Sequence, residues 1–146
     1  MKTMKAGVML LSIWSGLNGL VAVAVTAMTL SGRTPPALSM RFTEPEIRSL
    51  DDRVIGVVNA QAALANPCIV ALCLLVLVLT WKGTARKARW AFWALAISLV
   101  PLQAFGFVSD GFLGHRNIAA NIASTAILLT GLTLSGLDLF RQPGSD

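Results

Sequence analysis

Uncharged polar side chains recur at a fixed spacing inside apolar stretches of this sequence. Asn59 and Asn66 are seven residues apart, and so are Gln103 and Asp110. Seven residues are close to two turns of an α-helix, so each pair lies on one face of its helix. Amides avoid hydrocarbon unless they find hydrogen-bond partners. We therefore expect both faces to point into the protein.

A third polar face is predicted nearer the end of the chain. Its residues fall within an arc of about 80° on a helix, and they are Asn117, Asn121, Ser124, Gly131 and Ser135. Two interpretations of the amides stay open. In the first, they hydrogen-bond between helices and hold the helices together. In the second, they line a water-accessible pocket that opens outward and is formed by Asn59, Asn66, Gln103, Asn117 and Asn121.

Charged residues beside these stretches could form the rim of such a pocket. Asp110, His115 and Arg116 lie within one short segment that also holds two glycines, and Arg53 directly precedes the second apolar stretch. A carboxylate beside a histidine can orient the ring as a general base. More often such residues anchor a turn at the membrane interface. We assign the four residues to the rim and name no catalytic residue.

The sequence lacks the common signatures of enzymes and metal sites. It has no phosphate-binding G-x-x-x-x-G-K-[ST] loop, no H-E-x-x-H and no G-x-S-x-G. One histidine, His115, excludes bis-histidine haem ligation within a single chain and argues against a classical metal site. We expect no cofactor and no metal. A proton-coupled transporter is disfavoured because the first three apolar stretches carry no charge at mid-depth.

Arg53 and Asn59, at the head of the second apolar stretch, resemble the same region of the membrane enzymes of eicosanoid and glutathione metabolism. That family has four spans in a chain of similar length, and it normally carries a glutamate shortly after the asparagine. Ala62 and Ala63 occupy that region here. Because of this difference, the chain is not assigned to the family.

Four apolar runs must position these residues. The second, Val54–Trp81, has 28 residues without a charge, and about 20 helical residues already cross a bilayer. Overall, 55% of the residues are hydrophobic and only 13% are charged. We predict an all-α integral membrane protein with four transmembrane helices in an up-down bundle. It forms a single domain, residues 1–146, with spans at about 7–31, 54–81, 90–109 and 117–137 and an outer loop at 32–53.

The first run could instead be a secretory signal peptide. Lys2 and Lys5 precede it, and Ala22-Val23-Ala24 has the form of a cleavage site. The apolar region of a signal peptide is usually about 7–15 residues long, and this run is far longer. We therefore expect an uncleaved span.

Lysine and arginine set the expected orientation. The second loop, Lys82–Arg89, holds four basic residues in eight. Basic residues concentrate in cytoplasmic loops. We therefore expect this loop and both termini in the cytoplasm, with Trp81, Trp90 and Trp93 at the interface. The predicted location is a bacterial inner (cytoplasmic) membrane.

The outer loop contains one helix signal. Thr43 and Glu46 match a capping box, which predicts a helix that starts near Thr43. That helix either continues into the second span or bends near Asp51-Asp52. Before it, Pro35-Pro36 predicts an extended segment. The loop either compensates its own charges or covers the outer mouth of the bundle.

Small residues favour a function in association. Spans one and four should pair, because rows of small residues let helices approach closely, and span four has Gly131 and Ser135. The row in span one is Ser12, Ser15, Gly19, Ala22 and Thr26. We favour a non-catalytic accessory or interaction subunit of a membrane complex, with a membrane protein or a second copy as partner.

The alternative function is a protein or enzyme that binds a lipid, a quinone or an amphipathic small molecule in the outward pocket. In either case the lipid bilayer is a partner. Nucleic acid is not expected, although the formal charge is +5, because the basic residues flank apolar runs instead of covering a face.

Overall fold

The computed structural model describes residues 2–34, 36–112, 114 and 117–141, and within these residues every regular element is helical. In chain order the elements are α1 (Lys2–Leu30), α2 (Pro36–Arg41), α3 (Glu44–Arg48), α4 (Asp52–Val78), η1 (Leu79–Gly83), η2 (Thr84–Arg86), α5 (Arg89–Phe112) and α6 (Ile118–Phe140). Among the described residues, α1, α5, α6 and the helix that begins with α4 are long and apolar enough to cross a membrane. The four predicted spans therefore correspond to the four long helices.

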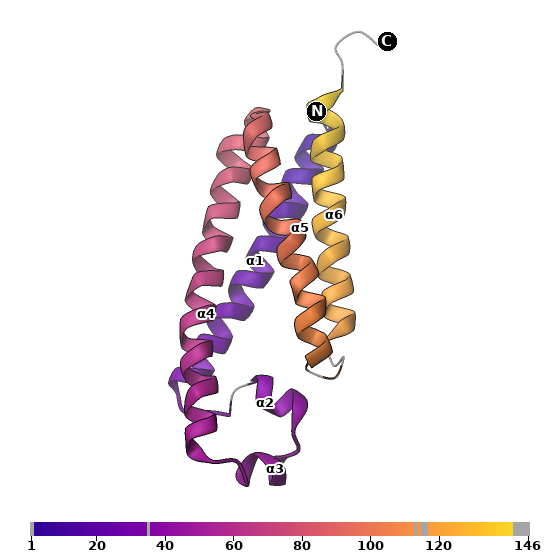
Figure 1. The fold of residues 1–146 in the computed structure, drawn as a ribbon. Helices are drawn as coiled ribbons and strands as arrows, with labels where there is room; N and C mark the ends of the chain where they lie inside the picture. Colours follow the sequence, from indigo (N-terminus) through magenta and orange to yellow (C-terminus); the bar gives the residue numbers. More distant parts are fainter. Residues whose placement is uncertain (1, 35, 113, 115–116, 142–146) are drawn as a thin grey trace.

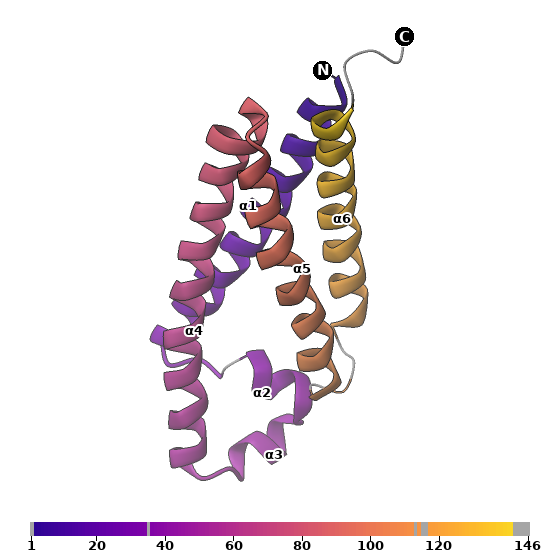
Figure 2. The same ribbon diagram turned by 45° about the horizontal axis from the view of Figure 1, so that its top comes forward.

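The helix α1 lies at the centre of the molecule and packs along both α4 and α6 (Figure 1). The helix α5 packs against α6 and against the turns η1 and η2. From these turns α4 and α5 diverge towards α2 (Figures 1 and 2). We expected every pair of consecutive spans to pack side by side. The pairs α1–α4 and α5–α6 do so, whereas α4 and α5 make little contact along their length.

A close approach between α1 and α6 fixes one side of the core. A Cβ atom on Gly7 would lie 2.7 Å from the backbone nitrogen of Ser135 and 2.8 Å from the carbonyl oxygen of Gly131. One turn further along α1, the side chain of Leu11 packs over Gly131 and is fully buried. The expected pairing of spans one and four through Gly131 and Ser135 is therefore present.

The row of small residues expected to form that pairing partly faces the other neighbour of α1. The Ser15 hydroxyl donates a hydrogen bond to the Cys73 carbonyl of α4 at 2.6 Å, and Gly19 also packs on Cys73. Ser15 lies about 80° around the helix from Gly7, since successive residues turn by about 100°. Helix α1 therefore uses separate small-residue faces for α4 and for α6, and the expectation of a single row was wrong.

The connection between α4 and α5 is a compact pair of irregular turns. A π-helical turn, η1, and a 3₁₀ turn, η2, follow α4 without a break, and Lys87 then takes a left-handed conformation at φ 61°. Gly83 lies in contact with Ala91 at the start of α5. We call the end of the molecule that holds η1, η2, Lys2 and Phe140 the hairpin end.

At the opposite end, which we call the loop end, α2 and α3 run across the bundle below the gap between α4 and α5 (Figures 1 and 2). The sequence predicted an extended segment at Pro35-Pro36, whereas Pro36 is the first residue of helix α2. Proline is well suited to the first position of a helix, because its φ is already helical and its missing N–H is not needed there. Leu38 of α2 and Ile47 of α3 are both buried.

The helix predicted near Thr43 is present as α3. The Glu46 carboxylate accepts hydrogen bonds from the backbone N–H and the hydroxyl of Thr43, both at 2.7 Å. The helix ends at Arg48, and α4 begins after Asp51, whose side chain accepts from the N–H of Arg53. Of the two alternatives, the chain therefore bends at Asp51 and does not run straight into α4.

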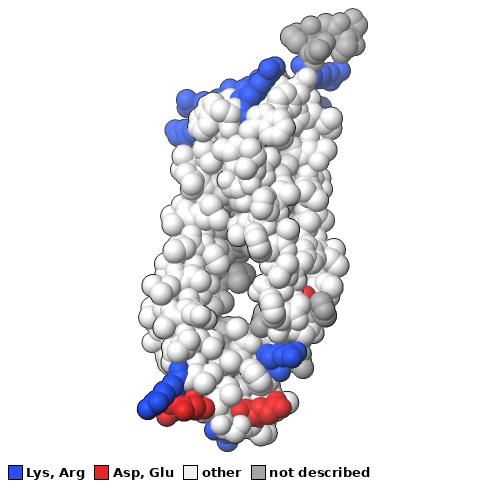
Figure 3. All heavy atoms as spheres, viewed as in Figure 1, with Lys and Arg blue, Asp and Glu red and all other residues white. Residues whose placement is uncertain are grey.

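Charged side chains gather at the two ends of the molecule, and a broad uncharged band separates them on the face shown in Figure 3. The molecule exposes 9398 Å², compared with about 7,200 Å² for a compact soluble protein of this mass. Large apolar side chains of all four long helices contribute to this surface.

Candidate functional site

A chain of hydrogen bonds links three helices at the level of the predicted polar faces. The indole nitrogen of Trp14 on α1 donates to the Ser124 hydroxyl of α6 at 2.8 Å. That hydroxyl donates in turn to the amide oxygen of Gln103 on α5 at 3.4 Å. The sequence interpretation missed Trp14, although a mid-span indole N–H needs a partner and was a signal for this bond.

Gln103 and Asn121 bridge α5 and α6 directly. The Gln103 amide nitrogen donates to the carbonyl oxygen of Asn121, and the Asn121 amide nitrogen donates to the carbonyl oxygen of Gly106, each at 3.3 Å. Both side chains are partly buried. These two amides therefore hold α5 and α6 together in the structure.

At the loop end, Asp110 organises the junction between α5 and α6. Its carboxylate is 2% exposed and accepts a hydrogen bond from the backbone N–H of Asn117 at 2.8 Å. The Asn117 amide nitrogen approaches the Met40 sulfur of α2 at 3.5 Å, which ties the loop to this junction. His115 and Arg116, two of the predicted rim residues, lie outside the described residues.

The predicted polar residues of α4 stand apart from this network. The Asn66 amide nitrogen donates to the Ala62 carbonyl of its own helix at 2.8 Å. The Asn59 amide oxygen is buried and has no hydrogen-bond partner among the described residues. Arg53 lies exposed in the first turn of α4. The structure thus joins Gln103 and Asn121 by a direct hydrogen bond, and neither Asn59 nor Asn66 takes part in that contact.

The molecule is hollowed between α4 and α5, above α2, as the space-filling view shows (Figure 3). Helix α4 is covered on one side only, because Cys73 and Val76 are its only buried residues. Its exposed side is apolar: Leu64 is 74% exposed and Val57 is 58% exposed. The helix α4 therefore packs on α1 along one side, and its other side has no partner within the described part of the chain.

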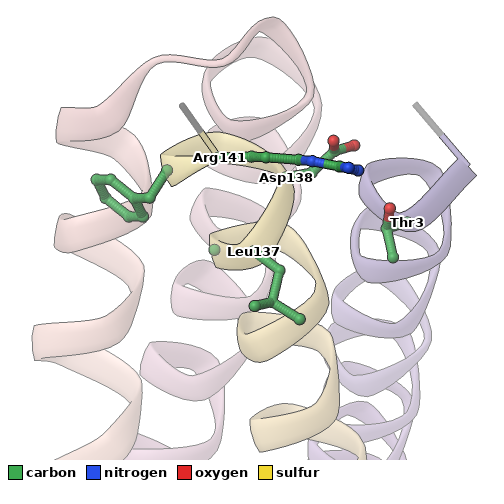
Figure 4. A pocket seen from close by; sticks show the side chains of 6 residues that line it. Thr3, Leu137, Asp138 and Arg141 are labelled. Carbon is green, nitrogen blue, oxygen red and sulfur yellow. The ribbon is translucent and has the colours of Figure 1, made fainter. Parts of the chain in front are cut away.

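Two grooves lie at the hairpin end. One, of about 680 Å³, is lined by residues of α6 and by Thr3, and it includes Asp138 and Arg141 (Figure 4). Asp138 accepts a hydrogen bond from the backbone N–H of Met4 at 3.0 Å, so it fastens α6 to the first turn of α1. The other groove, of about 650 Å³, lies between α1 and the turns η1 and η2.

The described residues contain no cluster of three histidine, cysteine, aspartate or glutamate side chains that could hold a metal ion. Comparison with protein-family models, with curated proteins and with solved structures found no match for this chain.

Proposed function

We propose that this protein spans a lipid bilayer four times and acts as a non-catalytic interaction subunit of a membrane complex. The observation that carries this proposal is the unpartnered side of α4. Only Cys73 and Val76 of α4 are buried, while α5 diverges from it and leaves a hollow in the apolar band. The occupant that we propose is a transmembrane helix of a partner protein.

The charges support a bilayer location with the hairpin end in the cytoplasm. Apart from Asp138, the charged side chains described at that end are all basic, namely Lys2, Lys5, Lys82, Arg86, Lys87, Arg89 and Arg141. The loop end mixes both signs, since four acidic residues of the loop and the start of α4 accompany its arginines. The positive-inside rule therefore favours a cytoplasmic hairpin end and cytoplasmic termini. A bacterial inner membrane fits this arrangement.

The surface of α4 suits helix packing. Seven exposed positions follow a spacing of three and four residues and are all apolar: Val57, Ala60, Leu64, Pro67, Ala71, Leu74 and Val78. Large and small side chains alternate along much of this seam, a pattern that lets a second helix pack closely in a membrane. Gly56 adds room, because a Cβ atom there would meet no atom within 4 Å.

The interaction role is favoured over catalysis by the use of the polar residues. Gln103, Asn121 and Ser124 hydrogen-bond between helices, so these groups are engaged in holding the bundle. Such bonds contribute about 0.6–2 kcal/mol each in membrane proteins.

Photo-crosslinking within the membrane tests the proposed role. Leu64 is replaced by a photoreactive benzophenone amino acid, and the cells are irradiated. Ile122, 56% exposed on α6, serves as the matched control position. We expect one protein adduct of defined mass from position 64 and no protein adduct from position 122. Mass spectrometry identifies the protein attached in that product. The crosslinking is then repeated in cells that lack this partner, where the product should disappear.

Two outcomes would contradict the proposed partner. Products of twice the chain mass would show that a second copy occupies the seam of α4, and a foreign subunit would then be excluded. If irradiation at position 64 attaches only lipid, as at position 122, then α4 faces the bilayer and the interaction role fails.

A second candidate function is supported by Asn59. Its buried amide oxygen lacks a partner, and α4, on which it lies, borders the hollow that α2 covers at the loop end. An amphipathic ligand, such as a lipid or a quinone, could donate a hydrogen bond to Asn59 there. This function predicts an Asn59 side chain that solutes can reach from the loop end.

Cysteine accessibility separates the two functions. Asn59→Cys is made in a Cys68→Ala, Cys73→Ala background and probed in intact cells with a membrane-impermeant thiol reagent. Ser39→Cys, in exposed α2, reports that the reagent reaches the loop end. Labelling at both positions supports the ligand-binding function. Labelling at 39 alone supports a hollow that is sealed from water.

A further inference from the structure

The groove between α1 and the irregular turns has an apolar floor and a basic edge. Val8, Met9 and Ile13 of α1 form one wall, and Trp81 and Ala85 form the other. Its volume of about 650 Å³ falls within the range of ligand-binding sites in proteins. Trp81 is 58% exposed, so its ring is open to a molecule that enters the groove.

One basic side chain lines this groove, and two more are neighbours in sequence of lining residues. Lys5 lines it directly, and Lys82 and Arg86 immediately follow the two lining residues of the turns. The acidic side chain described at this end, Asp138, lies on α6 and lines the other groove. It accepts a hydrogen bond from the N–H of Met4, a residue that also lines this groove. Lys5 therefore supplies a positive charge at the groove itself, and Lys82 and Arg86 add positive charge to the turns that form its other wall.

We propose that this groove is a binding site for one anionic phospholipid of the cytoplasmic leaflet. One acyl chain lies along Val8, Met9 and Ile13, and the phosphate group contacts the Lys5 ammonium. Charge complementarity decides the headgroup: basic pockets between transmembrane helices on the cytoplasmic side favour anionic lipids. Trp81 fits the boundary between chain and headgroup, where indole rings prefer to lie.

The irregular turns form one wall of the groove. A regular α-helical continuation of α4 would keep the same spacing of side chains along α1. The π-helical turn and the 3₁₀ turn change that spacing between Leu79 and Arg86. Isolated π-helical turns occur frequently at functional sites, and here Trp81 lies within one.

The proposal rests on the membrane placement proposed above and is independent of the interaction role. Quenching of Trp81 fluorescence by phospholipids with brominated acyl chains tests it. The full-length protein carries Trp90→Phe and Trp93→Phe, and the signal of the same protein with Trp81→Phe is subtracted. Trp14 is kept, because it is buried and hydrogen-bonded to Ser124.

The protein is reconstituted in phosphatidylcholine vesicles that contain brominated phosphatidylglycerol or brominated phosphatidylcholine at the same mole fraction. We expect brominated phosphatidylglycerol to quench Trp81 more strongly than brominated phosphatidylcholine does. The association constant of phosphatidylglycerol relative to that of phosphatidylcholine should rise about fivefold for each nearby cation. Lys5→Gln should reduce this preference about fivefold. Arg141→Gln removes a charge from the same end but from a different groove, and it should leave the preference unchanged.

A reference protein keeps Trp90 in place of Trp81 and separates a failure of the lipid site from a failure of the membrane placement. Trp90 is 67% exposed and does not line the groove. Equal quenching of Trp81 by the two lipids, or a Lys5→Gln protein with the full preference, overturns the lipid site. Absence of quenching of Trp90 by either lipid would instead show that the membrane placement itself is wrong.

Discussion

At the scale of single residues, the amide side chains differ in their hydrogen-bond partners. Gln103 and Asn121 donate to backbone carbonyls across the α5–α6 contact, whereas Asn66 donates within its own helix. Asn59 keeps a buried oxygen without a partner. A buried acceptor without a partner costs free energy, while a satisfied one contributes to the stability of the bundle.

Replacement by leucine should therefore have opposite effects at two of these positions. Asn59→Leu removes an unsatisfied acceptor and should stabilise the folded protein by about 1–3 kcal/mol. Asn121→Leu removes an interhelical hydrogen bond and should destabilise it by about 0.6–2 kcal/mol. The midpoint of unfolding by sodium dodecyl sulfate in mixed micelles measures both. Destabilisation by Asn59→Leu would show that the Asn59 amide oxygen does have a hydrogen-bond partner in the folded protein.

The Glu46 carboxylate makes the start of α3 sensitive to pH. Hydrogen bonds from the backbone N–H and then the hydroxyl of Thr43 lower the pKa of Glu46 below its ordinary value of 4.5. Because the folded pKa is the lower one, the stabilisation is complete above pH 4.5 and is lost as the pH falls through the folded pKa. The amide shift of Thr43 in the nuclear magnetic resonance spectrum should follow this titration.

Glu46→Gln provides the control for that titration. Glutamine keeps the shape of the cap and accepts the same hydrogen bonds, but it does not titrate. The Thr43 amide shift of the variant should stay constant over the same range of pH. A titration of equal size in the variant would mean that another group causes it.

At the scale of elements, close packing of small residues holds α6 on α1. Gly7→Ala places a Cβ atom within 2.8 Å of the Gly131 carbonyl oxygen, so α6 must shift, at a cost of about 1–3 kcal/mol. Gly16→Ala, in the same helix, meets no atom within 4 Å and should stabilise by about 0.5–1 kcal/mol. Unfolding midpoints of the two variants test this contrast, and equal midpoints would exclude the close contact at Gly7.

At the scale of the whole molecule, the distribution of charge predicts the orientation. Ser39→Cys at the loop end and Ala85→Cys at the hairpin end are each made in a Cys68→Ala, Cys73→Ala background. A membrane-impermeant thiol reagent should label position 39 in intact cells and position 85 only after the membrane is disrupted. The reverse pattern would place the hairpin end outside and contradict the proposed orientation.

Elements that depend on local chemistry could be predicted from the order of the residues alone. The lengths of the apolar runs predicted four long helices, since a chain in hydrocarbon must satisfy its backbone groups within each segment. Thr43 and Glu46 predicted the start of α3, because the groups of a cap lie within a few residues of each other. The clustered basic residues of the second loop likewise marked one end of the molecule.

Which helix faces meet depends on how the helices pack in the folded protein. In a soluble helix a polar face shows which side is exposed. In these long helices most positions on every side are apolar, and the few amides mark an inward side without showing which neighbour it meets. That is why Ser15 and Gly19 were assigned to the wrong neighbour, and why the divergence of α4 from α5 was not foreseen. The partners of Gln103 and Asn121 likewise depend on how α5 crosses α6. Such crossings result from packing over whole helices, which the spacing of residues along one helix does not specify.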